Sequence, residues 1–321
     1  MTDTLIERTP LSLLLTAADS PFGLLLTQRL VAAGHQVAGL TATTDGAAHV
    51  RAQGGLPVYA DAIRQGELKS LIAMRKVEVV INLSAQAHNH IPLRNAAWDT
   101  DALEDTASAL IAAASESGAK FYLHTSFAFV YGDHHGAWVD ETTRPTPGDQ
   151  PLLRAALRAE MQARAASIPS CILRLGFLYG TQSPELHALY DALRLNRPML
   201  AGAGIANWVQ MEDAAEAIRR AAEARIADGI YNIVDSAPAS SAAFLTTFAA
   251  GLGLRPPMSI PAFAGRAVLS QHQLDLMKQS VKVRNARAIE ELGWTPRFAS
   301  HVAGLEDTFL SWRAMTVPMI S

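Results

Sequence analysis

Side chains that can transfer a proton or bind a metal ion follow two apolar runs of the sequence. His88 and His90 come after VINLSAQA, and Tyr131, Asp133 and His134 come after YLHTSFAFV. Imidazole titrates near neutral pH and is a common metal ligand, so these residues are candidates for acid–base chemistry or for a metal site. A histidine in a loop more often only hydrogen-bonds to its neighbours. We therefore predict no metal site and keep Tyr131, His134 and His88 as candidate acid–base residues.

A second candidate site is the turn TAADSPFG, residues 16–23, between an apolar run and an amphipathic stretch. In dinucleotide-binding folds such a turn carries glycines that admit the pyrophosphate and let the helix pack closely on the strand. Ala17, Ser20 and Gly23 occupy those positions here. Asp19 adds a negative charge, which at ~6 Å and an effective dielectric of ~20 costs a bound phosphate about 3 kcal/mol. The sequence DSP also predicts an ordinary helix start, and we favour that interpretation.

Short apolar runs alternate with longer helical patterns up to residue 175. The runs that indicate strands are Ser12–Thr16, Gln36–Leu40, Leu56–Tyr59, Val77–Leu83, Lys120–Thr125 and Ser170–Leu175. The stretches that indicate helices between them include Phe22–Ala33, Asn95–Ser117 and Leu152–Ser167. Because strands and helices alternate and several strands are apolar throughout, we predict an α/β fold: a Rossmann-like, doubly wound parallel sheet covered on both faces.

After Gly180 helical patterns dominate. Helices are predicted at Glu185–Leu195, Met211–Ile226, Ser241–Gly251 and Arg266–Met277, with extended pieces at Trp208–Gln210 and Ile230–Val234. We predict a dinucleotide-binding-type domain over residues 1–180, to which residues 206–235 return. Residues 181–205 and 236–321 would form a smaller, mainly helical substrate-type domain.

Eight segments, in this order, carry a resemblance to a known family. They are SLLLTAADSPFGLLLTQRLVAAGHQVAGLT, LPVYADAI, VINLSAQ, YLHTSFAFVYGD, CILRLGFLYG, AGAGIANWVQMEDAAEAI, GIYNIVD and NARAIEELGWTPRF. Over nearly its whole length the chain resembles the extended short-chain dehydrogenases/reductases of the NAD-dependent epimerase/dehydratase family. The resemblance implies the same fold and a dinucleotide crevice at the carboxyl ends of the strands.

The resemblance also implies a catalytic tyrosine, a lysine four residues after it, and a serine or threonine that orients the substrate oxygen. The serine or threonine position, four residues before the tyrosine of VYG, is Phe127, and the tyrosine and lysine positions fall at Leu152 and Ala156. No Tyr-x-x-x-Lys occurs in the sequence. Since these three side chains exchange no protons, the family's usual proton relay is predicted to be absent.

The cofactor positions that the resemblance implies are only partly kept. They are Ala17, Ser20, Phe22, Gly23, Thr41, Asp61 and Leu83. Where a carboxylate would hold the adenosine ribose, or an arginine a 2′-phosphate, the second strand ends in Thr41 and Ala42. Asp61 matches the adenine-side aspartate of the family and equally suits a helix N-cap. We predict no dinucleotide, or weak NAD(P) binding.

Three functions remain open at this point. The one we favour is a non-catalytic member of the family, a pseudoenzyme that acts as a scaffold, accessory subunit or ligand sensor. The alternative is a divergent NAD(P)-dependent oxidoreductase or sugar epimerase/dehydratase that uses other acid–base groups. A third is a binding module whose crevice takes a different small molecule.

Composition limits the partners. A net charge of −3 without a basic run argues against nucleic acid, and no stretch approaches the ~20 apolar residues of a membrane span. A lone cysteine, Cys171, and an N-terminus unlike a signal peptide predict a cytoplasmic protein. Family members often pair, so a homodimer through Asn95–Ser117 and Leu152–Ser167 is expected, and a larger protein complex is the other possibility.

Overall fold

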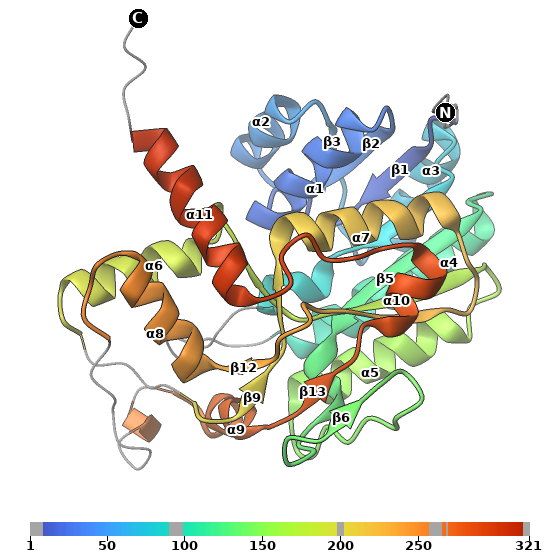
Figure 1. The fold of residues 1–321 in the computed structure, drawn as a ribbon. Coiled ribbons are helices and arrows are strands. Elements are labelled where there is room, and N and C mark those ends of the chain that lie inside the picture. Colours follow the sequence, from blue (N-terminus) through green and yellow to red (C-terminus); the bar gives the residue numbers. More distant parts are fainter. Residues whose placement is uncertain (1–8, 90–98, 198–201, 257–264, 268, 317–321) are drawn as a thin grey trace, which may run out of the picture.

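A parallel sheet forms the centre of the structure, a computed structural model that describes residues 9–89, 99–197, 202–256, 265–267 and 269–316 (Figure 1). Within these ranges the sheet has seven strands, in the order β11-β7-β5-β4-β1-β2-β3, and every neighbouring pair is parallel. The strands are β1 (Ser12–Leu15), β2 (Gln36–Thr41), β3 (Leu56–Tyr59), β4 (Val79–Asn82), β5 (Phe121–Phe127), β7 (Ser170–Leu175) and β11 (Ile230–Ile233).

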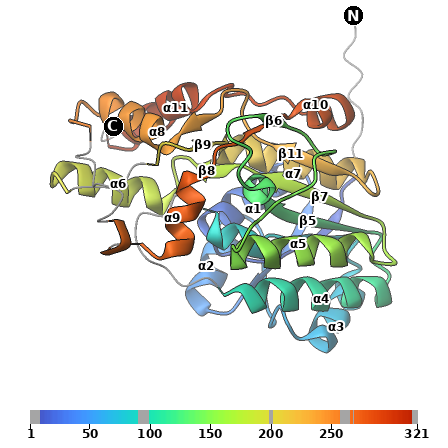
Figure 2. The same ribbon diagram turned by 90° about the horizontal axis from the view of Figure 1, so that it is seen from below.

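Helices cover both faces of the sheet (Figure 2). One face carries α1 (Pro21–Ala32) and α7 (Met211–Ala224), and the other carries α3 (Gln65–Arg75), α4 (Thr100–Glu116) and α5 (Pro151–Arg164). A further helix, α2 (Thr44–Ala52), packs beside β3. In β1, Leu13 and Leu15 join the core under α1 and α7, whereas Leu14 joins the core under α3, α4 and α5. The predicted doubly wound α/β sheet is therefore confirmed.

The strand order reverses between β1 and β4. From β1 the sheet grows through β2 to β3 in one direction, and from β4 through β5 and β7 to β11 in the other. In such sheets a ligand crevice lies at the carboxyl ends of the strands that flank this point. The turn of residues 16–23 follows β1, and Leu83 follows β4, so the topology brings these predicted cofactor positions to one edge.

Much of the remaining chain forms a smaller, mainly helical lobe, at the left of Figure 1. Its helices are α6 (Pro184–Arg194), α8 (Ser241–Gly251), α9 (Gln271–Lys278) and α11 (His301–Thr316). Short strands pair as β8 (Phe177–Tyr179) with β10 (Trp208–Gln210), β9 (Ile205–Ala206) with β12 (Ala239–Ser240), and β6 (Trp138–Val139) with β13 (Lys282–Val283). Stacked rings fill its core, with Trp208 and Phe244 4.2 Å apart and Phe129 and Phe177 4.5 Å apart between centroids.

Most predicted elements agree with the structure to within a few residues. One predicted helix, Arg266–Met277, is wrong as a single element. It is a short 3₁₀ turn, η3 (Gly265–Ala267), followed by α9, because Ser270 forms a capping box with Gln273 and starts a new helix there. The helix predicted from Asn95 is described from Thr100, where Asp99 caps α4, and Asn95 itself lies outside the described residues.

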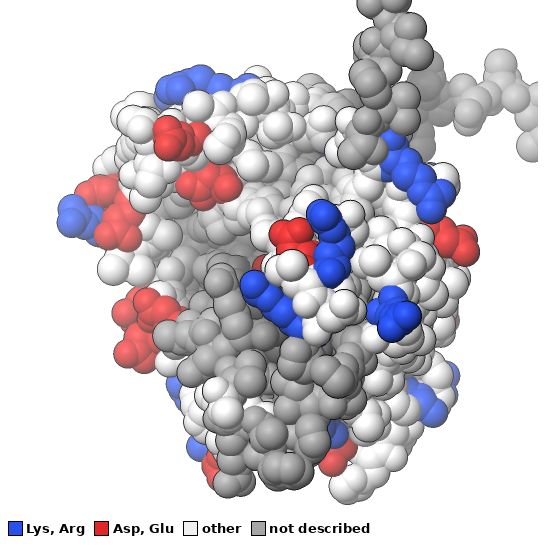
Figure 3. All heavy atoms as spheres, turned by 90° about the vertical axis from the view of Figure 1, so that its left-hand side faces the viewer, with Lys and Arg blue, Asp and Glu red and all other residues white. Residues whose placement is uncertain are grey.

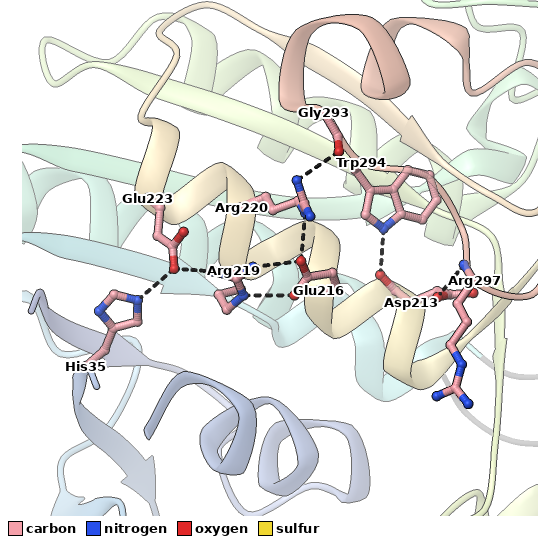
Figure 4. A network of polar contacts seen from close by, with 9 residues as sticks. All are labelled: His35, Asp213, Glu216, Arg219, Arg220, Glu223, Gly293, Trp294 and Arg297. Atoms are coloured by element: carbon pink, nitrogen blue, oxygen red, sulfur yellow. Dashed lines mark hydrogen bonds and ion pairs between the residues drawn. The ribbon is translucent and has the colours of Figure 1, made fainter. Parts of the chain in front are cut away.

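The C-terminal part of the chain returns to the sheet domain. Trp294 follows α10 (Ala286–Leu292), is fully buried, and donates its indole N–H to the Asp213 carbonyl at 2.9 Å (Figure 4). The Asp213 carboxylate accepts the backbone N–H groups of Arg297 and Phe298 at 2.9 and 3.0 Å. Further ion pairs run along α7 toward β2, through Glu216, Arg219, Arg220, Glu223 and His35. The tail and the first βαβ unit thus hold α7 from opposite sides.

No helix within the described ranges combines the length and the apolar character that crossing a membrane requires. On the side of the molecule at the left of Figure 1, acidic and basic side chains are interspersed among the described residues (Figure 3).

Candidate functional site

The turn after β1 is closed by its own hydrogen bonds. Ala17 takes the left-handed conformation, with φ of 48°, and its carbonyl accepts both the N–H and the hydroxyl of Ser20, at 3.1 and 2.7 Å. The Ser20 hydroxyl in turn caps α1 by accepting the Gly23 N–H at 3.0 Å. A Cβ on Gly23 would lie 2.1 Å from the Ala17 oxygen, so only glycine fits there. The helix start predicted from DSP is present, with Ser20 as its N-cap.

The Asp19 side chain contacts the end of β2. Its Oδ2 accepts the hydroxyl hydrogen of Thr41 at 2.7 Å, at the carboxyl end of that strand. The sequence placed the charge of Asp19 near a bound phosphate, whereas the structure places the carboxylate at the end of β2. The electrostatic cost assigned to Asp19 stays a prediction.

A wide pocket of about 640 Å³ opens beside this contact, over the ends of β1, β2 and β3. Ala17, Asp19, Thr41, Tyr59 and Asp61 contribute to its lining. Asp61 accepts the backbone N–H of Ile63 at 3.1 Å, so it stabilises the turn before α3 while its side chain stays about half exposed. In a dinucleotide-binding sheet this is the adenosine side of the crevice.

Buried polar side chains are hydrogen-bonded to one another at the end of β4, the neighbour of β1 on the side opposite β2. Thr16 donates its hydroxyl to Asn82 Oδ1 at 3.1 Å and accepts the Leu83 N–H at 2.8 Å. The Asn82 amide donates to the Tyr122 hydroxyl at 3.0 Å, next to His124. Burial lowers the pKa of His124 to about 4, so this imidazole is neutral at physiological pH. Leu83 is fully buried.

The positions that the family resemblance assigns to proton transfer lie in an apolar core. Phe127, Leu152 and Ala156 are all at most 2% exposed and pack in the cluster shared with Phe129 and Phe177. None of them carries an ionisable group. This part of the structure is built for packing.

One turn further along α5 is a charged residue that the sequence analysis did not select. Glu160 forms a two-point ion pair with Arg174 of β7, at 3.0 and 2.6 Å, and both side chains are 4% exposed. The Arg174 guanidinium also lies over the Tyr131 ring, 4.9 Å from its centroid. The available signal was Glu160 standing in a stripe of buried alanines, at the helical spacing from Leu152 and Ala156.

Of the candidate acid–base residues, the side chains of Tyr131 and His134 are described, and they form no hydrogen bond with each other. Tyr131 is fully buried, its hydroxyl donates to Asn232 Oδ1 at 3.0 Å, and burial raises its pKa. His134 is half-buried, with Nε2 3.1 Å from the Tyr131 carbonyl. His88 ends the 3₁₀ turn η1 (Ser84–His88), and its side chain and His90 lie outside the described residues. Among the described residues no three His, Cys, Asp or Glu side chains gather as metal ligands.

A buried carboxyl follows β11. Asp235 is 2% exposed and accepts the Ala237 N–H at 3.1 Å, while its Oδ2 has no hydrogen-bond partner among the described residues. Burial raises its pKa to about 8. Because the folded-state pKa lies above the ordinary value near 4, the contribution of Asp235 to stability is fully present below pH ~4 and is lost as the pH rises through about 8.

Replacing this carboxyl by an amide should remove that pH dependence. An Asp235→Asn variant is expected to match the native protein at pH 4 and to gain on it by up to about 1.4 kcal/mol of unfolding free energy per pH unit between pH 4 and 8. Urea unfolding at several pH values, followed by circular dichroism, measures this. Asp149→Asn, with a side chain 97% exposed, is the control and should show no such trend. An Asn variant that is less stable than the native protein at pH 8 would contradict the prediction.

Comparison with known proteins gives this fold a family. The sequence model of the NAD-dependent epimerase/dehydratase family matches residues 18–234, more than half of the chain. The chain belongs to this family. One relative aligns over nearly the whole chain. It is a Streptomyces protein named 3-diazoavenalumate denitrifying reductase, 28% identical over 303 residues, which cover 91% of this chain and 98% of the relative. A Mycobacterium leprae epimerase family protein is 27% identical over 172 residues, which cover 50% of this chain and 54% of that protein.

Solved structures of the epimerase/dehydratase class share the fold. UDP-glucose 4-epimerase from Thermotoga maritima, solved with UDP-glucose, has a TM-score of 0.77 at 18% identity, with 96% of this chain and 100% of that one covered. A human epimerase family protein, solved with NADPH, has a TM-score of 0.75 at 20% identity, with 93% and 99% covered. At these identities the likeness establishes the fold.

Proposed function

We propose that this family member is a dinucleotide-dependent reductase that works without the tyrosine–lysine pair. The observation that carries the proposal is a contrast within one fold. The adenosine side of the crevice keeps an open pocket with Asp19, Thr41 and Asp61, while the proton-relay positions Leu152 and Ala156 are apolar and buried. A fold that offers this pocket and lacks the tyrosine–lysine pair fits a reaction that needs hydride and no proton from that pair.

The residues present suit a dinucleotide in part. Asp19, Thr41 and Asp61 would hold the adenosine, and Gly23 lets α1 approach β1 closely. A reduced nicotinamide would supply hydride when bound. Ser20 caps the start of α1, so the phosphates would rely on the remaining backbone of the turn.

The class of substrate is argued from the absence of the tyrosine–lysine pair at positions Leu152 and Ala156. A carbonyl group needs a proton on its oxygen as hydride arrives, whereas a carbon that bears a good leaving group does not. In a diazonium-type substrate the C–H bond forms as the C–N bond breaks, and dinitrogen leaves with the electron pair of the broken bond. The name of the full-length Streptomyces relative, a denitrifying reductase, supports this class.

Isotope labelling tests the proposal. The protein is incubated with an aryl diazonium acid and 4-deuterated NADH or NADPH, and in parallel with unlabelled cofactor in D₂O, with protein-free controls. We expect protein-dependent release of dinitrogen and deuterium in the product only from the labelled cofactor. UDP-sugars and simple ketones should not oxidise the cofactor. Turnover of UDP-sugars, or product labelled from D₂O, would overturn the proposal.

The second candidate remains a non-catalytic member of the family that acts as scaffold or ligand sensor. The closed turn favours it, because Ala17 and Ser20 satisfy each other and the Gly23 N–H without any anion. Calorimetric titration, together with the turnover assay, distinguishes a scaffold, a ligand sensor and a reductase. A scaffold binds neither NADH nor NADPH, a sensor binds without turnover, and the reductase does both.

We also infer that two copies pair through α4 and α5. These helices lie side by side on an outer face of the sheet (Figure 2), and a shallow groove of about 500 Å³ runs between them, lined by small residues such as Ser108, Ala112 and Ala166. Met161 of α5 is 68% exposed. Sedimentation of the native protein and of a Met161→Glu variant tests the pairing, which the added charge should weaken.

A further inference from the structure

We propose that Asp19, from the turn after β1, is the carboxylate that holds the adenosine ribose, and that it makes the site select dinucleotides without a 2′-phosphate. This inference rests on the proposed binding of a dinucleotide. In ordinary dinucleotide-binding sheets the ribose carboxylate comes from the end of the second strand. Here that strand ends in Thr41 and Ala42, so the role would have moved to another element.

The position of the Asp19 carboxylate supports the exchange of roles. Its Oδ2 is 2.7 Å from the Thr41 hydroxyl, so the carboxylate lies at the end of β2 although it belongs to a different loop. Its Oδ1 makes no hydrogen bond within the described part of the chain, and Asp19 lines the 640 Å³ pocket. A carboxylate that is held through one oxygen and open at the other can accept a hydrogen bond from a ribose hydroxyl.

The neighbouring helix fixes this arrangement. A Cβ on Gly46, in the first turn of α2, would meet both Asp19 Oδ2 and Thr41 Oγ1 at 2.4 Å. Glycine at this position therefore leaves room for the Asp19–Thr41 contact. The carboxylate is enclosed on the α2 side and faces the pocket on the other.

The charges of the pocket decide between the two dinucleotides. Among the described residues that line it, the charged ones are Asp19, Asp61 and Glu67, all acidic. Arg64 pairs with Asp61 at 3.5 Å and with Glu67 at 3.0 Å, so Asp19 is the carboxylate of this pocket without a cationic partner among the described residues. A 2′-phosphate carries a charge near −2 at neutral pH and would be repelled by that carboxylate. A ribose with a free 2′-hydroxyl offers a donor instead. The pocket therefore favours NADH over NADPH.

Binding titrations test the inference without any substrate. NADH and NADPH are titrated into the full-length protein by calorimetry, and into Asp19→Asn, Asp45→Asn and Ala42→Arg variants. The native protein should bind NADH at least about tenfold more tightly than NADPH, and Asp19→Asn should reduce that ratio about tenfold. The Thr41 hydroxyl can still donate to the asparagine oxygen, so the fold should be kept.

Two further variants sharpen the result. Asp45 lies on the exposed first turn of α2 and does not line the pocket, so Asp45→Asn makes the same change of charge and should leave the ratio unchanged. Ala42 is exposed at the pocket, so Ala42→Arg should fold and shift the preference toward NADPH. If NADH binds and Asp19→Asn leaves the ratio unchanged, or if the native protein prefers NADPH, only this inference is overturned. Binding of neither dinucleotide overturns it together with the proposed function.

Discussion

A Glu160→Gln variant is expected to lose about 3–5 kcal/mol of unfolding free energy. Glu160 and Arg174 are each 4% exposed and form two hydrogen bonds, so the substitution leaves a guanidinium buried without its counter-charge. The stacking of Arg174 over Tyr131 offsets only a small part of this cost. Urea unfolding of both proteins at neutral pH gives the difference directly.

The same helix offers a matched control. Arg158 of α5 forms a two-point pair with Glu104 of α4, at 2.6 and 2.5 Å, but the two side chains are 54% and 22% exposed. Glu104→Gln should therefore cost less than about 1 kcal/mol. A double variant, Glu160→Met with Arg174→Met, should regain most of the loss, since an apolar pair needs no desolvation of charge. Equal losses for Glu160→Gln and Glu104→Gln would show that burial does not control these pairs.

A Gly23→Ala variant should be the most damaging small substitution in the first turn. Its Cβ would lie 2.1 Å from the Ala17 oxygen and 2.9 Å from the Ala18 Cα, both of them backbone atoms that cannot turn aside. Overpacking of this kind costs about 1–3 kcal/mol or more, against a gain of about 1 kcal/mol in helix propensity. Because both contacts are with backbone atoms, we expect the cost at the upper end of this range and a net loss of about 2 kcal/mol, measured as a lower urea midpoint, together with displacement of Ser20 and Asp19.

Gly66 supplies the comparison of opposite sign. It lies in the first turn of α3, is exposed, and a Cβ there would meet nothing within 4 Å. Gly66→Ala should therefore stabilise the protein by about 0.5–1 kcal/mol. If both alanines shift stability in the same direction, close packing at Gly23 is not the controlling factor.

The sequence was most informative where local signals agreed. Ser170–Leu175 and Leu56–Tyr59 are strands with the predicted ends, because short apolar runs there are bounded by turn residues. The two-residue strands β9 and β12 were not predicted, since they exist only by pairing with each other across a long stretch of chain. Such pairing leaves no periodic trace in either segment.

In the candidate site, too, local features could be predicted from the sequence and long-range contacts could not. The apolar character of Phe127, Leu152 and Ala156, at the positions that the family resemblance assigns to proton transfer, could be read from the sequence because residue identity is a local property. The partner of Asp19 could not, since its contact with Thr41 spans 22 residues and depends on how the turn is oriented by Ala17 and Ser20. The pairing of Glu160 with Arg174 likewise requires α5 to be docked on β7.

The burial of Trp294 against α7 has a consequence for the order in which the chain acquires its structure during synthesis. By the time residue 180 has been made, every strand of the central sheet except β11 exists. At that stage the apolar face of the sheet that packs against α7, Ala288, Leu292 and Trp294 is not yet covered by them. That surface stays open to solvent and to chaperones until the tail has left the ribosome. The sheet domain of this protein is completed by residues that follow its last strand in the sequence.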